Sequence, residues 1–356
     1  MNEQTVHMLH EDAINLLKQL IATPSLSKEE DETAEIIQHF LESKGVVTHQ
    51  YLNNIWAKNK YFDESKPTIL LNSHHDTVKP NKSYTLNPFE PIEKDGKLFG
   101  LGSNDAGGSL VALINVFLYF YPQQNLKYNF IIAATAEEEI SGPNGVEILL
   151  PRLPKIDFGI VGEPTMMDMA LAEKGLLVLD CITHGIPGHA AREEGDNAIY
   201  KAVKDIVWFK NYQFDKVSDL LGPMKMSVTI INAGSQHNVV PSECKFTVDV
   251  RVNELYTFEE VLDIIKKNVV SDVIPRSCRL RSTSISINHP IIQSGIELGR
   301  KYYGSPTTSD KALMSFPALK MGPGDSARSH TADEFIYIDE IKNGIDLYIQ
   351  LLNQIV

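Results

Sequence analysis

The chain has 356 residues, of which 43% are hydrophobic and 22% are charged, and its formal net charge is −13. This composition is close to the average of folded proteins and excludes a disordered chain, and the negative charge disfavours a nucleic-acid partner because such binders rely on basic patches. The length exceeds what one hydrophobic core usually organises, so we expect two domains.

The sequence indicates a soluble, cytoplasmic protein with no membrane partner. The polar N-terminus lacks the basic and apolar regions of a secretory signal. The longest apolar run, 110–121, is interrupted by Asn115 and is too short to span a bilayer. Three widely spaced cysteines form no CxxC pair, so we expect reduced packing residues, with one disulfide as the alternative. They are Cys181, Cys244 and Cys278.

The first half of the chain alternates helical and strand patterns. Apolar residues recur at three- and four-residue spacing over 11–20 and 31–41, which predicts two amphipathic helices. Short apolar segments bounded by polar loops then predict buried strands, with a helix between the first two. We expect the strands at 68–71, 129–134 and 158–162, and the helix at 109–120. This order indicates an α/β fold with a mixed, largely parallel sheet flanked by helices.

His74 and Asp76 directly follow the first of these strands. In extended backbone, residues two apart point the same way, so we expect the Asp76 carboxylate to accept a hydrogen bond from His74. Such a partner fixes the ring tautomer of a histidine that binds zinc. The alternative is a surface histidine beside a turn aspartate, and this short motif leaves that alternative open.

Asp105 lies in a glycine-rich turn, 98–108, that leads into the next helix. The glycines permit a tight backbone path that presents the carboxylate at the start of the helix. A phosphate-binding turn is the alternative, but Asp105 stands where GxGxxG needs its third glycine and would repel a pyrophosphate. We therefore favour a metal ligand.

Four more acids follow apolar strands. The strand predicted at 129–134 is followed by Glu137, Glu138 and Glu139, and the strand predicted at 158–162 is followed by Glu163. A run of acids is usually a solvated face. Because ligands gather at the carboxyl ends of strands in an open α/β sheet, however, these carboxylates converge and must take up protons or find a cation. A divalent metal is the simplest answer.

The pattern changes after residue 175. Strands at 176–184, 225–233, 243–252 and 278–287 and helices at 196–210 and 257–269 give the order βαββαβ, which is typical of a compact ferredoxin-like α+β unit. We therefore expect an inserted lid domain at 176–286 and a metal-binding catalytic domain formed by 1–175 and 287–356. The last segment has helical patterns at 291–303 and 338–355, around a polar loop that contains His330.

Five ordered motifs resemble the metal-site motifs of the acetylornithine deacetylase and succinyl-diaminopimelate desuccinylase family, which comprises cocatalytic zinc amidohydrolases and peptidases. Each motif is weak alone, but five in order across the whole chain are specific. They are SerHisHisAspThrVal at 73–78, GlyLeuGlySerAsnAspAlaGlyGly at 100–108, ThrAlaGluGluGluIle at 135–140, ValGlyGluPro at 161–164 and SerHisThr at 329–331.

The resemblance implies two divalent metal ions per chain, zinc or alternatively cobalt. One ion is held by His74, Asp105 and Glu163, and the second by Asp105, Glu139 and His330, so that Asp105 bridges them. Two such ions share and acidify a water molecule and polarise the scissile carbonyl.

Three catalytic roles also follow from the resemblance. Glu138 is the general base that takes the proton of the water and later delivers it to the departing amine. Asp76 orients His74. His189, in the insert, stabilises the tetrahedral oxyanion; because it lies outside the metal-binding domain, closure of the insert or a neighbouring subunit must bring it to the metals. An exposed loop histidine is the alternative.

Two insert residues match positions that grip the substrate in relatives. They are Asn238 and Arg251. An arginine has the planar geometry for bidentate binding of a carboxylate, and a solvated arginine at a strand end is the alternative. The family also implies a homodimer formed through the lid.

The resulting hypothesis is hydrolysis of the amide of a small N-acyl amino acid, with N-acetylornithine, an intermediate of arginine biosynthesis, as the first candidate. The segment GlyProGlyAsp at 322–325 resembles the acetylornithine deacetylases, but Asp325 and Ser326 depart from the residues expected there. N-succinyl-diaminopimelate, succinylornithine, acylated citrulline or lysine, and dipeptides stay open.

Two other classes of protein compete with this hypothesis. An inactive protein that binds amino-acid derivatives predicts a missing base or ligand, yet every position is filled. A dinucleotide-dependent enzyme requires the third glycine that the 100–108 turn lacks.

Overall fold

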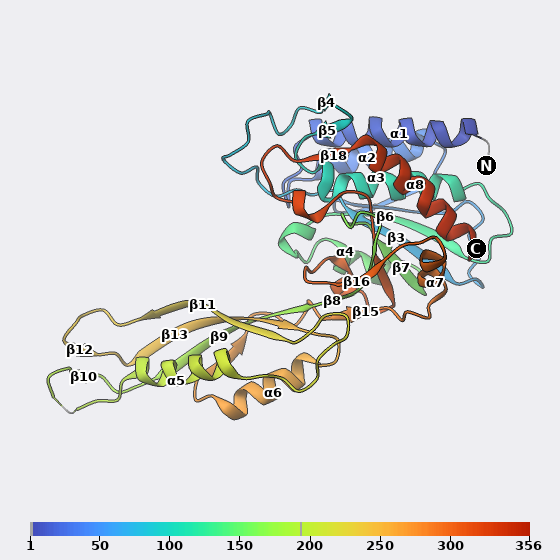
Figure 1. Ribbon diagram of the computed structural model, residues 1–356. Helices are drawn as coiled ribbons and strands as arrows, with labels where there is room; N and C mark the ends of the chain where they lie inside the picture. The colour runs from blue at the N-terminus through green and yellow to red at the C-terminus, as the bar shows by residue number, and fades with distance from the viewer. Residues whose placement is uncertain (1–2, 193) are drawn as a thin grey trace. The chain divides into compact units, whose positions relative to one another are not determined.

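The computed structural model describes residues 3–192 and 194–356, and the chain divides into two compact units (Figure 1). The first contains Met1–Leu171, Ile285–Tyr303 and Ser309–Val356. The second contains Ala172–Ser284 and Gly304–Thr308. Each unit has its own sheet and its own buried core.

A mixed sheet forms the centre of the first unit, in the order β1-β2-β6-β3-β7-β17-β8. The middle strands β6, β3, β7 and β17 are parallel neighbours, whereas β1, β2 and β8 pair antiparallel. The bounds are β1 Thr48–Tyr51, β2 Asn54–Lys58, β3 Thr68–His74, β6 Asn129–Thr135, β7 Phe158–Val161, β8 Met169–Glu173 and β17 Ala318–Lys320. The predicted α/β class with a largely parallel centre is confirmed.

Helices cover both faces of this sheet (Figure 1). On one face lies α3 (Gly108–Phe120), which is buried along almost its whole length because α1 (Glu3–Ala22) and α8 (Ile338–Asn353) pack over it. On the other face, buried side chains of α4 (Val146–Leu149) pack with Leu70 of β3 in an apolar cluster. The first unit is completed by α2 (Asp31–Ser43) and α7 (Pro290–Glu297).

A small antiparallel sheet, which the sequence analysis does not predict, leads into the glycine-rich turn. It joins β4 (Ile92–Lys94) and β5 (Lys97–Phe99) to β18 (Phe335–Tyr337), which comes from the far end of the chain. The pairing of β5 with β18 places the segment after His330 beside the segment before Asp105. None of the helices among the described residues has the length and apolarity that a bilayer-crossing segment needs.

The second unit has the predicted βαββαβ order. Its strands form an antiparallel sheet in the order β11-β13-β9-β14, and its helices are α5 (Ala198–Asn211) and α6 (Phe258–Asn268). Alternate residues of β9 (Gly175–His184) and β13 (Glu243–Val252) are buried against these helices. The edge strands are β11 (Lys225–Ala233) and β14 (Asp272–Pro275). Two of the three free cysteines, Cys181 and Cys244, are buried in this core.

Two predicted elements are wrong. The strand predicted at 278–287 does not form; β14 takes the edge position beside β9, where Val273 is buried opposite Cys181, and β15 (Thr283–Ser284) pairs with β8 instead. The helix predicted at 291–303 ends at Glu297, because Gly299 adopts a left-handed conformation (φ 75°) and β16 (Tyr302–Ser305) follows.

Candidate metal centre

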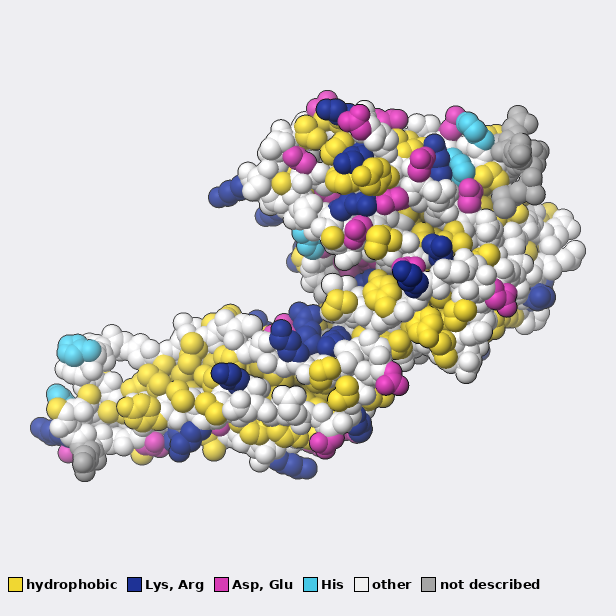
Figure 2. All heavy atoms as spheres, in the orientation of Figure 1, with side chains coloured by type: hydrophobic (Ala, Val, Ile, Leu, Met, Phe, Trp, Pro, Cys, Tyr) yellow, Lys and Arg dark blue, Asp and Glu magenta, His cyan; other side chains and the backbone are white. Residues whose placement is uncertain are grey.

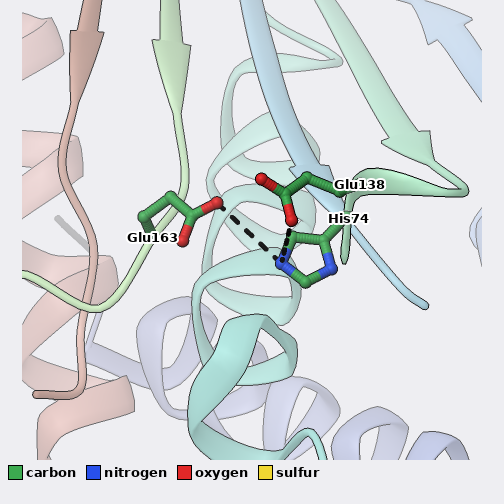
Figure 3. A group of neighbouring side chains, drawn as sticks. All are labelled: His74, Glu138 and Glu163. Carbon is green, nitrogen blue, oxygen red and sulfur yellow. Dashed lines mark ion pairs between the residues drawn. The ribbon is translucent and has the colours of Figure 1, made fainter. Parts of the chain in front are cut away.

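The candidate ligands of the first unit meet at one edge of its sheet because neighbouring parallel strands end there. His74 is the last residue of β3 and lies opposite Thr135, the last residue of β6. Glu138 follows β6 in a short 3-10 turn, Glu138–Ile140, and Glu163 follows β7 by two residues. Figure 3 shows His74, Glu138 and Glu163 turned toward one another from the ends of three different strands and the loops that follow them.

The Nε2 atom of His74 faces a ring of carboxylates. It lies 3.4 Å from Asp105 Oδ1 and 3.9 Å from both Glu138 Oε2 and Glu163 Oε1. The Nδ1–H group donates to the backbone carbonyl of Asp76 at 3.0 Å. Because Nδ1 carries this proton, the lone pair of the neutral ring is on Nε2, the atom that faces the acids.

Asp105 lies between the two candidate histidines. Its Oδ1 atom is the one near His74, and its Oδ2 atom is 3.6 Å from Nε2 of His330. His330 in turn lies 3.0 Å from Oε2 of Glu139. The carboxylate of Asp105 is therefore shared between two ligand groups, one buried around His74 and one around the half-exposed His330.

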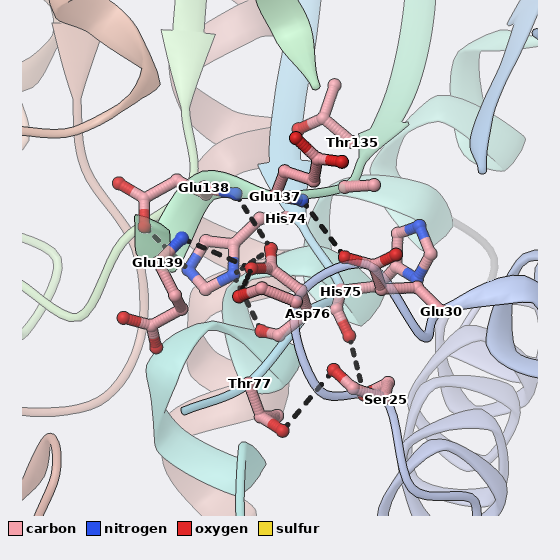
Figure 4. Close-up of polar contacts among 12 residues, drawn as sticks. Ser25, Glu30, His74, His75, Asp76, Thr77, Thr135, Glu137, Glu138 and Glu139 are labelled. Atoms are coloured by element: carbon pink, nitrogen blue, oxygen red, sulfur yellow. Dashed lines mark hydrogen bonds and ion pairs between the residues drawn. The ribbon is translucent and has the colours of Figure 1, made fainter. Parts of the chain in front are cut away.

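Asp76 acts differently from the prediction. The closer acceptor of His74 is its backbone carbonyl, and its Oδ1 atom lies 3.4 Å from His74 Nδ1. The carboxylate accepts the backbone N–H groups of Glu138 at 3.0 Å and Glu139 at 3.1 Å, and the hydroxyl of Ser27 at 2.7 Å (Figure 4). A single buried carboxylate thus anchors the turn that carries both glutamates.

The turn after β6 is also fixed from its other side. Glu137 is left-handed (φ 56°), and its N–H donates to Glu30 Oε1 at 3.3 Å. The Glu137 carboxylate accepts two N–H groups of Asn144, one from the backbone and one from the side chain. Of the three consecutive acids, Glu137 is therefore structural, and the turn points Glu138 and Glu139 to the cluster.

The electrostatics of the cluster favour positive charge. Burial lowers the pKa of His74, but the nearby carboxylates of Asp105 and Asp76 outweigh burial and bring that pKa well above its ordinary range. Burial raises the pKa of Glu138 well above its ordinary range despite the opposing charge of His74. The hydrogen bond to Glu139 raises the pKa of His330 to about 9. Clustered carboxylates bind protons or cations because they repel one another.

The donor set fits divalent metal ions. Among the residues that the structure describes, two groups have ligand atoms that all lie within 4.8 Å of one another: His74, Glu138 and Glu163, and His74, Asp105 and Glu139. The buried Nε2 atom of His74 has no hydrogen-bond partner, although buried polar atoms normally find one. Imidazole nitrogen and carboxylate oxygen are the usual ligands of zinc. The first group differs from the predicted ligand sets by including Glu138, and the second by having His74 in place of the half-exposed His330. His330 contacts both Asp105 and Glu139, as its predicted place in the second set requires.

Two buried acids beside the cluster were not predicted. Asp310 accepts hydrogen bonds from Asn72 of β3 and Thr135 of β6, and burial raises its pKa to about 6. Glu334 accepts backbone N–H groups of the turn that carries Asp105, and burial raises its pKa to about 7. Neither acid follows a predicted strand, whereas the predicted ligands at the ends of β3, β6 and β7 are recognised by that position. The sequence pattern therefore does not indicate these two acids.

The remaining candidates lie in the second unit. His189 and Asn238 are exposed residues beside a short two-stranded sheet, in which β10 (Gly188–His189) pairs with β12 (Val239–Val240) and Ala190 N donates to Asn238 O at 2.9 Å. Ala191 N donates to Nδ1 of His189 at 3.1 Å. Because Nδ1 accepts this bond, the neutral ring carries its proton on Nε2, where it can be donated.

Arg251 is not near that two-stranded sheet. Its strand β12 directly precedes Glu243, the first residue of β13, and β13 advances about 26 Å from Glu243 to Arg251 at the usual rise per residue. The guanidinium of Arg251 forms two hydrogen bonds with the carboxylate of Asp249, at 2.8 and 3.1 Å. Arg251 also lies opposite Lys225 in the sheet, and burial, together with the charges of these two residues, lowers the pKa of Lys174. This end of the second unit therefore brings together three cationic side chains, those of Arg251, Lys225 and Lys174, of which Arg251 is paired with Asp249.

Comparisons with known proteins find relatives that span most of this chain. Two curated relatives are each named succinyl-diaminopimelate desuccinylase. The one from Wolbachia pipientis subsp. Culex pipiens is 26% identical over 375 residues, covering 96% of this chain and 92% of the relative. The one from Buchnera aphidicola subsp. Acyrthosiphon pisum is 29% identical over 280 residues, covering 72% of this chain and 73% of the relative.

Solved structures share the fold at low sequence identity. Aminopeptidase PepT from Bacillus cereus superposes with a TM-score of 0.76 at 18% identity, covering 97% of this chain and 98% of that one. A dinuclear metal-binding peptidase of the M20 family from Bacillus subtilis superposes with a TM-score of 0.73 at 16% identity, with the same coverage. The model of peptidase family M20/M25/M40 matches residues 70–354, so the chain belongs to this family.

Proposed function

We propose that this protein hydrolyses the amide bond of a small N-acyl amino acid, with the help of two divalent metal ions. The observation that carries this proposal is the Asp105 carboxylate, whose two oxygens face two different histidines, each with further acids around it. A shared carboxylate between two ligand groups is what a two-metal site needs. Membership of the peptidase family supports hydrolysis as the reaction.

His74, Asp105 and Glu163 would hold one ion, and Asp105, Glu139 and His330 the other. When bound, two such ions acidify water and stabilise negative charge on a carbonyl oxygen. Zinc is the first ion to test, since imidazole and carboxylate ligands suit it, and cobalt is the second.

Glu138 would move the proton. Its carboxylate is held toward the cluster by the backbone hydrogen bonds of its turn to Asp76. As general base it takes one proton from the attacking water while the water oxygen bonds to the carbonyl carbon. It returns that proton to the nitrogen when the carbon–nitrogen bond breaks, so that an amine and a carboxylate leave.

His189 would donate a hydrogen bond to the oxygen that becomes negative in the tetrahedral intermediate. The bond from Ala191 N to its Nδ1 supports this role, because it places the ring proton on Nε2. A donor aimed at a developing oxyanion is among the larger contributions to catalysis. The segment 176–286 acts in this proposal as a lid that supplies the donor.

The substrate we favour is N-succinyl-diaminopimelate rather than N-acetylornithine. The curated relatives carry the desuccinylase name, and they support this alternative better than deacetylation in arginine biosynthesis. The cationic end of the second unit, around Arg251, also suits a substrate with several carboxylates, because the succinyl group has one that an acetyl group lacks. Asn238 would bind a second polar group of the substrate.

We also propose a homodimer formed through the second unit. On α5, Tyr200, Val203 and Val207 form an exposed apolar stripe, and Ile230 and Ile231 are exposed on the edge strand β11. Figure 2 shows apolar side chains gathered over this part of the molecule. An edge strand has unpaired backbone groups that a second copy can pair with. Because His189 and Arg251 lie at opposite ends of β13, a small substrate that touches both needs them from two copies.

The proposal is tested by release of free amine from a panel of substrates after the protein is loaded with Zn²⁺. We expect the fastest turnover with N-succinyl-diaminopimelate, slower turnover with N-acetylornithine, N-acetylcitrulline and dipeptides, and loss of turnover in excess chelator. Absence of turnover with every substrate would reject the enzymatic function and favour a binding protein. Sedimentation of Val207→Lys against the parent protein tests the dimer.

A further inference from the structure

Glu334 is a buried acid near the cluster that the proposed mechanism does not use. The residue is 1% exposed. Its Oε1 atom accepts the backbone N–H groups of Asn104 and Asp105, both at 2.9 Å, and its Oε2 atom accepts that of Gly102 at 3.1 Å. Its backbone carbonyl accepts the N–H of Gly100 at 3.0 Å. One residue therefore receives four N–H groups from a single turn.

This turn depends on such a partner. It runs from β5 into α3, and its N–H groups precede the regular hydrogen bonding of the helix, where donors have no partner within the helix itself. Gly102 is left-handed (φ 74°), and a Cβ atom there would meet Thr77 Cγ2 at 2.5 Å. Asp105 is extended (φ −119°, ψ 99°) rather than helical. Hydrogen bonds to a carboxylate are short and strong, so Glu334 fixes where the Asp105 side chain begins.

Glu334 is also only four residues from His330. The segment between them turns through left-handed residues at His330 (φ 60°) and Asp333 (φ 52°). A second link joins the same two parts of the chain: the side chain of Asn104 donates to Asp325 O and accepts from Asp325 N, both at 3.0 Å. The turn that carries Asp105 and the loop that carries His330 are thus bonded to each other directly.

We propose that Glu334 is a positioning residue that sets the separation of Asp105 and His330, and thereby the affinity of the metal subsite formed by Asp105, Glu139 and His330. This inference rests on the proposed two-metal function. The subsite around His74 needs Glu334 less, because His74 and Glu163 come from the ends of β3 and β7 and are held by the central sheet. Glu334 therefore affects the two subsites unequally.

The test is a titration of metal-free protein with Co²⁺ alone. Calorimetry measures the affinity of each bound equivalent, and visible absorption reports on its coordination. In Glu334→Gln, the side-chain amide places a donor against a backbone donor of the turn. We expect the first equivalent to bind within about 2-fold of the parent affinity and the second to bind about 10- to 100-fold more weakly, as when other partners of metal ligands are removed. The absorption that the second equivalent adds should change as well.

Asp333→Asn is the matched control. Asp333 is the adjacent acid, and its carboxylate likewise accepts backbone N–H groups, those of Thr85 and Leu86, but that loop carries no candidate ligand. Both Co²⁺ equivalents should bind this variant as they bind the parent. If Glu334→Gln shows no cooperative melting without metal, Glu334→Asp, which keeps the charge but is one methylene shorter, replaces it and should show the same selective loss.

The outcomes separate the inference from the function on which it rests. Parent protein that binds two Co²⁺ ions, with both equivalents unchanged or equally weakened in the Glu334 variant, overturns the positioning role alone. Parent protein that binds fewer than two ions overturns the two-metal function and this inference with it. Selective weakening of the second equivalent supports both.

Discussion

The two units hold their candidate residues in opposite ways. In the first unit, His74, Asp76 and Glu163 are buried at the ends of strands, and the Asp76 carboxylate accepts three hydrogen bonds. In the second unit, His189 and Asn238 are exposed on a two-residue pairing of β10 with β12. The difference follows from charge: acids that repel one another stay together only on a rigid frame, whereas a neutral donor needs no such support.

This contrast separates two tasks. A metal centre has to exist before the substrate arrives, so its ligands are oriented by buried partners. A residue that contacts the substrate is more useful on a segment that can move with a lid. Substitutions in the first unit should therefore affect metal binding or proton transfer, and substitutions in the second should affect turnover or substrate affinity with the metals retained.

The largest expected effect comes from Glu138→Gln. The amide keeps the shape of the side chain but cannot accept the proton of water, so we expect kcat to fall by about 10²- to 10⁴-fold. Metal content should be nearly unchanged, whereas Glu139→Gln should also lose affinity for the second ion. Rates and metal content measured on the same preparations check this, and equal residual rates with equal metal content would mean that the roles are exchanged.

His189→Ala should have the next largest effect. Removal of one oxyanion donor typically lowers kcat by about 10²- to 10³-fold, and the metals should stay bound because His189 belongs to the other unit. The control is His184→Ala, a nearby exposed histidine of β9 that pairs with Asp272. If the two variants have similar kcat values, the oxyanion role is wrong.

Asp76→Asn should weaken metal binding rather than abolish catalysis outright. The amide turns one donor toward the N–H groups of Glu138 and Glu139, so the turn should lose its anchor. Loss of such an orienting partner costs about 10- to 100-fold in metal affinity. Competition with a chromogenic chelator measures the affinity, and parent-like values for both ions would show that the turn does not need Asp76.

The smallest effect is expected from Arg251→Ala. Loss of one charge-assisted contact to a substrate carboxylate corresponds to about 10-fold in KM for N-succinyl-diaminopimelate, with kcat little changed. Arg276→Ala is the matched control, because Arg276 forms the same kind of two-bond pair with Asp180 on the same sheet. An equal rise of KM in both variants would assign the effect to the sheet and not to substrate binding.

Much of this arrangement can be predicted from the sequence because strand ends are visible in it. His74, the acids after β6 and Glu163 all follow short apolar runs, and neighbouring parallel strands bring such positions together. The βαββαβ order of the second unit is visible for the same reason. The edge strand β14 cannot be recognised in the sequence, because its segment DVIP at 272–275 is too short to show a pattern. The later stretch at 278–287 alternates polar and apolar residues as a strand would, but it does not form one strand of the sheet.

The bonds that orient the ligands are the part that sequence patterns miss. Asp76 binds backbone N–H groups 62 and 63 residues away, and Glu334 binds backbone N–H groups about 230 residues away. Such contacts depend on loop paths and leave no periodicity. Glu137 is a further example. In the sequence it looks equivalent to Glu138 and Glu139, but its carboxylate is bonded to Asn144 and its role is structural.

If the Asp105 carboxylate is shared by two divalent ions, both ions should be visible by anomalous diffraction at the zinc edge from crystals of Zn²⁺-loaded protein. We expect two peaks per chain, one among His74, Asp105 and Glu163 and the other among Asp105, Glu139 and His330. A single peak, or peaks that do not contact Asp105, would show that this carboxylate is not shared.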